Sequence, residues 1–193
     1  MMRSLMIIFT CLAAVSAHDL CDQDDVERLS REISAVKAEV LMRKTCPKDF
    51  AYNAELDSSY NFVTSLRLTW LNALLYCNRM GANLVAIDSQ KEYDFIKAEI
   101  ERTDLGWPRG AGHDSFYTGG TMLNGSPSLK LNAWQWAGGA TFKSKPMSYA
   151  PWHSTQGILT DTKDSLCHVL WAPGAYSWHD HPCHFKHHFI CEI

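Results

Sequence analysis

The sequence lacks a basic segment, and it lacks a long hydrophobic run beyond its first residues. Its 18 Lys and Arg residues are outnumbered by 21 Asp and Glu residues, for a formal net charge of −3. Because no stretch of positive charge could follow a phosphate backbone, nucleic-acid binding is not expected. No segment after residue 17 approaches the about 20 apolar residues that a membrane-spanning helix needs. We therefore expect neither a nucleic-acid partner nor a membrane span.

The sequence motifs of common hydrolases and nucleotide-binding enzymes are also absent. There is no HExxH, no Gly-x-Ser-x-Gly and no phosphate-binding glycine loop. The pairs Gly119-Gly120 and Gly138-Gly139 are typical of strand and turn positions instead. The sequence therefore predicts a binding protein and not an enzyme.

The first seventeen residues have the features of a secretory signal peptide. Arg3 supplies a positive charge, SLMIIFTCLAAV is a short apolar run, and Val15-Ser16-Ala17 has the small residues of a cleavage site. We expect residues 1–17 to be removed, so that the mature protein begins at His18 and is secreted. Six cysteines then remain, and an even number in an oxidising compartment predicts a disulfide framework.

Residues 22–45 contain no Gly, Pro or aromatic residue, and their apolar residues recur at alternating spacings of three and four. This heptad pattern predicts a helical stalk over residues 18–45 that forms a parallel coiled-coil dimer through residues 22–45. The alternative is a single amphipathic helix folded onto the domain. The apolar seam is Val26, Leu29, Ile33, Val36 and Val40. Charges of opposite sign flank it at Glu32, Glu39, Lys37 and Lys44.

Cys21 and Cys46 flank the stalk. A continuous helix between them would separate them by roughly 35 Å, at a rise of 1.5 Å per residue. Two cysteines so far apart cannot pair within one chain. We therefore expect both cysteines to be candidates for interchain disulfides in a covalent dimer.

From Cys46 onward the pattern predicts an α+β domain over residues 46–193. The expected elements are strands at residues 60–66 and 84–87, and helices at residues 69–80 and 89–101. After Arg102 no helical period recurs, and a long irregular stretch occupies residues 137–164. Helices early in the domain and strands late in it favour the α+β class.

The order of motifs in this second region resembles the C-type lectin-like domain. The motifs that carry the likeness are Thr69-Trp70, Tyr76-Cys77, residues 81–87, residues 116–120, Trp134, Trp136, Trp152, Cys167, residues 178–180, Cys183 and residues 189–192. The resemblance implies two helices, antiparallel strands and a long irregular loop region. It also implies two disulfides, Cys77 with Cys191 and Cys167 with Cys183. Cys46-Pro47 resembles the start of an additional pair found in some relatives, but no second cysteine follows Cys46 before Cys77.

Lectins of this family bind sugar through a Ca²⁺ in the loop region, and the motifs for that site are degenerate here. Where the family has Glu-Pro-Asn or Gln-Pro-Asp, this chain has Gln156-Gly157-Ile158. Where it has Trp-Asn-Asp, this chain has Trp178-His179-Asp180. Gln156 and Asp180 keep oxygen donors, and Asp164 is a further candidate near Cys167. Because Ca²⁺ prefers several charged oxygen ligands, we expect its affinity here to be poor.

The histidines suggest a second metal hypothesis. Imidazole suits Zn²⁺ or Cu²⁺ better than Ca²⁺, and in an extended chain His179 and His181 point to the same side. The candidate metal ligands are thus Gln156, Asp164, Asp180, His179 and His181. The alternative is a histidine-rich surface, and we expect His184, His187 and His188 to face solvent.

The resemblance implies recognition of glycans on cell or microbial surfaces, with a role in innate immunity. The candidate carbohydrate-binding residues are Gln156, Asp180, His179 and Trp152. Most tryptophans, Trp171 among them, are expected in the core, and Trp152 and Trp178 are expected to support the loops. The alternative function is a Ca²⁺-independent module that binds protein or another surface and no sugar.

Overall fold

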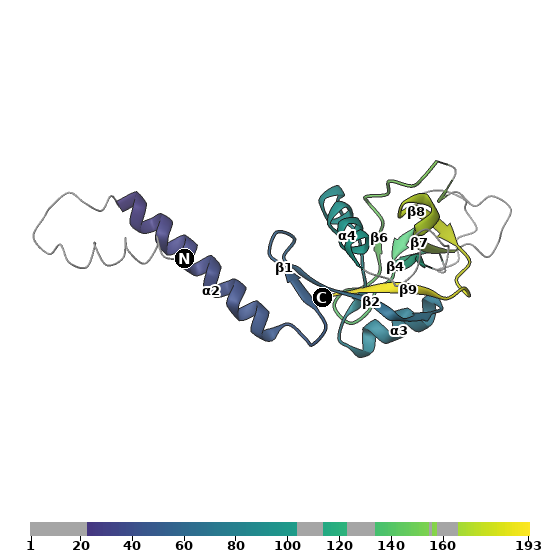
Figure 1. The fold of residues 1–193 in the computed structure, drawn as a ribbon, viewed down its shortest axis with the longest axis horizontal. Helices are drawn as coiled ribbons and strands as arrows, with labels where there is room; N and C mark the ends of the chain where they lie inside the picture. The colour runs from purple at the N-terminus through teal and green to yellow at the C-terminus, as the bar shows by residue number, and fades with distance from the viewer. Residues whose placement is uncertain (1–22, 104–113, 123–133, 155, 158–165) are drawn as a thin grey trace, which may run out of the picture. The chain divides into compact units, whose positions relative to one another are not determined.

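The computed structural model describes residues 23–103, 114–122, 134–154, 156–157 and 166–193. The chain divides into two compact units, Met1–Cys46 and Pro47–Ile193 (Figure 1). The expected signal peptide, Cys21 and Asp164 lie outside the described residues. None of the described helices is long and apolar enough to cross a membrane.

The described part of the first unit is one helix, α2 (Gln23–Thr45). Asp24 and Asp25 in its first turn interact favourably with the helix dipole. Four residues of the heptad seam are about half exposed: Val26, Ile33, Val36 and Val40. Most helices in proteins are stabilised by burial of such an apolar face. The helix is therefore present as expected, and its pairing with a second copy stays a prediction.

Two helices occupy the first half of the second unit, α3 (Trp70–Arg79) and α4 (Gln90–Arg102). Thr69 precedes α3 without a side-chain capping bond, and Gly81 follows it with a φ of +74°. Ser89 caps α4 by accepting a hydrogen bond from the N–H of Glu92. The Glu92 carboxylate accepts from the N–H of Asp88, one residue earlier than a regular capping box requires.

Nine strands of the described residues form one sheet in the order β1-β2-β9-β4-β5-β6, with β3 paired to β9 and β7 paired to β4 and β8. The strands are β1 (Ala51–Asn53), β2 (Ser58–Leu68), β3 (Asn83–Leu84), β4 (Phe116–Thr121), β5 (Gln135–Trp136), β6 (Lys145–Pro146), β7 (Cys167–Trp171), β8 (Ser177–His181) and β9 (His187–Glu192). The carboxyl-terminal strand β9 is central, because it pairs antiparallel with β2 and parallel with β4. The strand expected at residues 84–87 is shorter than predicted, although Val85 and Ile87 are buried.

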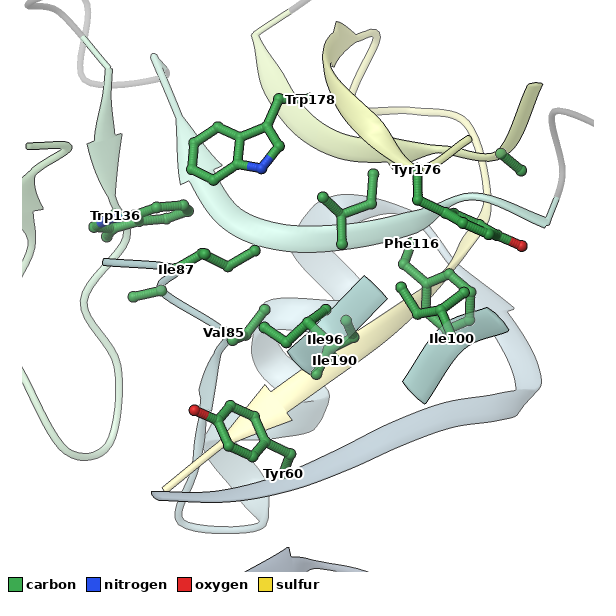
Figure 2. Close-up of a cluster of buried hydrophobic side chains, with 13 residues drawn as sticks. Tyr60, Val85, Ile87, Ile96, Ile100, Phe116, Trp136, Tyr176, Trp178 and Ile190 are labelled. Atoms are coloured by element: carbon green, nitrogen blue, oxygen red, sulfur yellow. The ribbon is translucent and has the colours of Figure 1, made fainter. Parts of the chain in front are cut away.

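Helix α4 covers one apolar core of this unit. Its Ile96 and Ile100 lie one turn apart on the same face and pack with Ile190 of β9 and Phe116 of β4 (Figure 2). All four are almost fully buried. Burying an aliphatic side chain of this size contributes about 1.5–3 kcal/mol. The α+β class is confirmed by this arrangement.

Two disulfides join distant parts of the unit. Cys77 of α3 bonds Cys191 of β9, across a separation of 114 residues. Cys167 of β7 bonds Cys183, which follows β8, across a separation of 16 residues. These are the two pairings that the resemblance implies. The first attaches α3 to the central strand, and the second closes the hairpin that carries the candidate site.

Candidate functional site

The hairpin of β7 and β8 positions most of the candidate residues. The two strands pair antiparallel, with Val169 opposite His179. Side chains alternate along a strand, so Trp178 and Asp180 lie on one face and His179 and His181 on the other. Trp178 is fully buried, whereas both histidines are partly exposed. One strand therefore contributes to the core and to a surface.

The buried face of β8 ends in a cluster of rings. The Trp178 ring centroid lies 5.7 Å from that of Trp136, 5.7 Å from that of Trp152 and 4.4 Å from that of His168. His168 is fully buried and hydrogen-bonded to the hydroxyl of Thr118, and burial holds its pKa well below the usual value. A neutral His168 fits this apolar setting. Trp178 and Trp136 are seen from the core side in Figure 2.

A tight turn, described at residues 152–154 and 156–157, packs onto this cluster. The N–H of Gly157 donates to Oδ1 of Asp180 at 2.7 Å, and Nε1 of Trp134 donates to the carbonyl oxygen of Gly157 at 3.0 Å. Gly157 has a φ of +73°, and a Cβ at this position would overlap the indole ring of Trp152. Glycine is therefore required here for conformation and for space.

The resemblance implies a Ca²⁺ site at this turn, and the described residues do not fit it. Ca²⁺ takes about six to eight oxygen ligands. The described positions offer the Gln156 amide, the Asp180 carboxylate and the His179 imidazole, and Oδ1 of Asp180 already accepts the bond from Gly157. Burial raises the pKa of Asp180, while the backbone hydrogen bonds oppose that rise. The carboxylate thus has a structural role in holding the turn.

The outer face of β8 carries a short row of rings next to the turn. His179 stacks on His153 with ring centroids 5.0 Å apart and an interplanar angle of 22°. Burial, and then the neighbouring His153 and His181, lower the pKa of His179 to about 4. Its Nε2 lies 3.1 Å from the hydroxyl of Ser177. At neutral pH the His179 ring is therefore uncharged, and it lies partly exposed against the exposed ring of His153.

The row continues beyond Trp171. The centroid of the Trp171 ring lies 6.1 Å from that of His179 and 5.1 Å from that of His181, on which it stacks. Trp171 is partly exposed, although the sequence predicted that it lies in the core. His187 and His188 are nearly fully buried, so the expectation that they face solvent is wrong. Both lie on the central strand β9, where the Tyr117 ring packs on His187 and the Phe116 ring packs on His188. Only His184 of these three is exposed.

The four candidate carbohydrate-binding residues lie on the turn and on β8, but they do not share one face. The turn carries Trp152 and Gln156, and the N–H of Gln156 donates to the carbonyl oxygen of His153 at 2.9 Å. Asp180 and His179 lie alongside on β8. By contrast, the strand places Asp180 on the face opposite His179 and His181, so these three do not form one metal site. Within the described residues, no group of three or more His, Cys, Asp or Glu side chains is arranged to hold a metal ion.

Sequence reasoning missed two ring contacts of β8. His153 has no motif of its own, and only the turn brings it against His179. His187 is six residues from His181 in the chain, yet its Nε2 lies 3.3 Å from Nδ1 of His181. The signal that was available is the density of histidine around Cys183, which does not identify which rings meet.

The family model for the lectin C-type domain matches residues 66–193. Among curated proteins, the type-2 ice-structuring protein of Hemitripterus americanus is 27% identical over 126 residues, which are 65% of this chain and 63% of that protein. The C-type lectin domain family 4 member M of Hylobates lar is 25% identical over 148 residues, 76% of this chain and 31% of that protein. The chain thus spans less than two thirds of the length of either relative.

Solved structures give the same result. The mouse scavenger receptor C-type lectin carbohydrate-recognition domain aligns with a TM-score of 0.56 at 25% identity, over 77% of this chain and 97% of that one. Herring type II antifreeze protein aligns with a TM-score of 0.56 at 30% identity, over 77% of this chain and 98% of that one. Each alignment covers nearly the whole of the matched domain. The chain belongs to the C-type lectin domain family.

Proposed function

We propose that this protein is a secreted lectin that binds glycans of cell or microbial surfaces without Ca²⁺. The binding surface is formed by the turn at residues 152–157 and the outer face of β8. The observation that carries the proposal is the stacking of the exposed His153 on the partly exposed His179, at a turn where the N–H of Gln156 donates to the carbonyl oxygen of His153. The similarity to a carbohydrate-recognition domain at 25% identity supports glycans as the ligand class.

The chemistry of this surface suits a sugar. The flat faces of neutral rings pack against the apolar C–H faces of a pyranose, as aromatic surfaces pack against other apolar groups. The amide of Gln156 offers both donors and an acceptor for hydroxyl groups. The Asp180 carboxylate supports the turn from behind through its bond to Gly157. In this arrangement no metal ion is needed to orient the ligand.

Secretion and dimerisation complete the proposal. Residues 1–17 would direct export, and the exposed apolar seam of α2 would pair with a second copy in a parallel coiled coil. Interchain disulfides at Cys21 and Cys46 would make the pair covalent. Two sugar-binding domains on one stalk raise a weak single-site affinity through avidity, which suits recognition of repetitive surfaces in innate immunity.

The deciding experiment is a glycan array with the mature protein, run in Ca²⁺ and in EDTA. We expect the same glycans to bind in both buffers. The variants His179→Ala and Gln156→Ala should lower the signal about tenfold or more, while His184→Ala, at an exposed histidine outside the site, should leave it unchanged. Binding that disappears in EDTA, or that ignores both site variants, would falsify the proposed mode of recognition.

A second candidate function is binding to an ice surface. It is favoured by the similarity to an ice-structuring protein and to herring type II antifreeze protein. The same row of rings would supply the contact surface. Thermal hysteresis of the mature protein distinguishes the two: hysteresis without any glycan signal would select this candidate, and its absence together with array binding would select the lectin.

A further inference from the structure

His181 and His187 approach each other at the carboxyl-terminal end of β8. His181 ends β8, and His187 begins the central strand β9. Their facing nitrogens, Nδ1 of His181 and Nε2 of His187, are 3.3 Å apart, the ring centroids are 4.9 Å apart and the ring planes are inclined at 76°. The disulfide between Cys167 and Cys183 anchors the short connection between the two strands.

This spacing matches two ligands of one tetrahedral metal ion. Zn²⁺ binds histidine nitrogen at about 2.0–2.1 Å, which places two nitrogens of a tetrahedron about 3.3 Å apart. A hydrogen bond between the rings accounts for the same distance in the absence of metal. Conversion to a metal site requires that the one proton between the facing nitrogens moves to the outer nitrogen of its own ring, while the two facing nitrogens already have the required separation.

We propose that His181 and His187 form a two-histidine site for a first-row transition ion, Zn²⁺ or Cu²⁺. Imidazole nitrogen is a preferred ligand for both ions. The described residues supply no third His, Cys, Asp or Glu side chain in a metal-holding group. Water, or a donor atom of a bound molecule, fills the remaining positions. The site is thus an open one, which is the arrangement that lets a metal contact a ligand.

Aromatic packing holds both rings in place. Trp171 stacks on His181 at 5.1 Å, and Phe185 meets the edge of the same ring at 5.0 Å. Tyr117 packs against His187 with centroids 4.9 Å apart. His187 is buried, whereas His181 is only half-buried, so an ion enters from the side of His181. Fixed ligand orientation strengthens metal binding because little side-chain freedom is lost.

This pair differs from the pair that the sequence suggested. His179 lies on the same face of β8 as His181, and the Trp171 ring contacts both histidine rings. The ring that stacks on His179 is that of His153, so His179 is not paired with His181. His179 is therefore the matched control: it is a histidine of the same strand and face that the proposed site does not use. His184 is a second control, because it is exposed and close in sequence.

The test is titration of the untagged mature protein with Zn²⁺ by calorimetry and with Cu²⁺ by tryptophan fluorescence. We expect one ion per chain and quenching by Cu²⁺, because Trp171 stacks on a ligand. His181→Asn should weaken metal binding at least about tenfold, because it removes one of the two protein ligands. Loss of a residue that only supports a metal ligand already costs about that much affinity. His179→Asn and His184→Asn should change it less than about twofold. Trp171→Phe should reduce the quenching and keep the calorimetric affinity.

His187→Gln is a second ligand variant, but its burial means that it has to be shown folded by circular dichroism before its affinity is compared. His181→Asn is sufficient for the test, because His181 is only half-buried and its replacement is not expected to unfold the domain. The proposal is overturned if His181→Asn binds either ion as the unmodified protein does, if no ion binds at micromolar concentration, or if His184→Asn removes binding. Loss with His181→Asn alone among the three asparagine variants supports it. Glycan binding is measured in a separate experiment, so a protein that binds no glycan would not affect the result of the metal titration.

Discussion

The backbone N–H of Gly157 donates a 2.7 Å hydrogen bond to Oδ1 of Asp180. The two residues belong to the two motifs that supply Ca²⁺ ligands in related lectins, and here they bond to each other. The carboxylate therefore stabilises the turn at residues 152–157, and the glycan surface depends on that turn. This relationship separates a structural role for Asp180 from a role in metal binding.

Replacement of Asp180 tests that separation. Asp180→Asn keeps an oxygen that accepts from Gly157, so the free energy of unfolding and glycan binding in EDTA should both be nearly unchanged. Asp180→Ala leaves the buried N–H of Gly157 without an acceptor and should destabilise the protein by about 1–3 kcal/mol. Chemical denaturation measures both variants. Equal losses from Asn and Ala would show that the negative charge matters and not the hydrogen bond.

Gly157→Ala should destabilise the turn for two reasons, and Gly81→Ala isolates one of them. Both glycines have a positive φ, of +73° and +74°, but only Gly157 faces a side chain that a Cβ would overlap. The positive φ costs alanine roughly 1–2 kcal/mol, and overpacking against Trp152 adds about 1–3 kcal/mol. Denaturation midpoints should therefore fall further for Gly157→Ala, which should also lose glycan binding. Matching losses in the two variants would contradict the close contact.

The stability of the domain should fall as the pH rises from about 4.5 through about 7. Burial, followed by the nearby Glu192, raises the pKa of Glu92 from 4.5 to about 7, although hydrogen bonds from Asp88 and Tyr60 oppose the rise. Because the folded pKa lies above the unfolded one, this contribution to stability is complete below about pH 4.5 and is lost as the pH passes 7.

Glu92→Gln should therefore reduce the drop in unfolding free energy between pH 5 and pH 8 by roughly 2 kcal/mol. Part of the drop should remain, because burial also raises the pKa of Glu192. Glu101→Gln, at an exposed position of the same helix, is the control and should leave the drop as it is. Thermal unfolding at the two pH values is the measurement. The same drop in unfolding free energy for the unmodified protein and both variants would refute the role of Glu92.

The stalk prediction rests on Ile33, which is 47% exposed at the centre of the seam. Ile33→Asp places a charge between two chains and should convert the dimer to a monomer under reducing conditions, as seen by sedimentation. Ser34→Asp adds the same charge outside the seam and should keep the dimer. A protein that sediments as a monomer without either change would show that α2 does not pair.

The two disulfides should differ in their contribution to stability. In the loop-entropy model, the bond between Cys77 and Cys191 closes the longer loop and contributes about 4–5 kcal/mol, and the bond between Cys167 and Cys183 contributes about 3 kcal/mol. Paired alanine variants, compared by urea denaturation, measure this difference. Loss of the second pair should additionally weaken metal binding at His181, since it anchors the connection to His187.

Local features were predictable because they depend on neighbours in the chain. The cap at Ser89, the end of α3 near Gly81 and the helix over residues 23–45 all follow from residues within one or two helical turns. The disulfide pairs follow from the family resemblance, because pattern alone allows many pairings. The strand predicted at residues 84–87 came out shorter, since an apolar run specifies burial and not a hydrogen-bonded partner.

The sequence by itself determined the helices, the α+β class and the stretch of chain where recognition residues gather. The tertiary structure alone decided what those residues do. In the fold, Asp180 accepts a hydrogen bond from Gly157, His179 stacks on His153, and His187 is buried beside His181. The physical reason is that strand register sets which side chains share a face, and register is fixed by pairing between segments far apart in the chain.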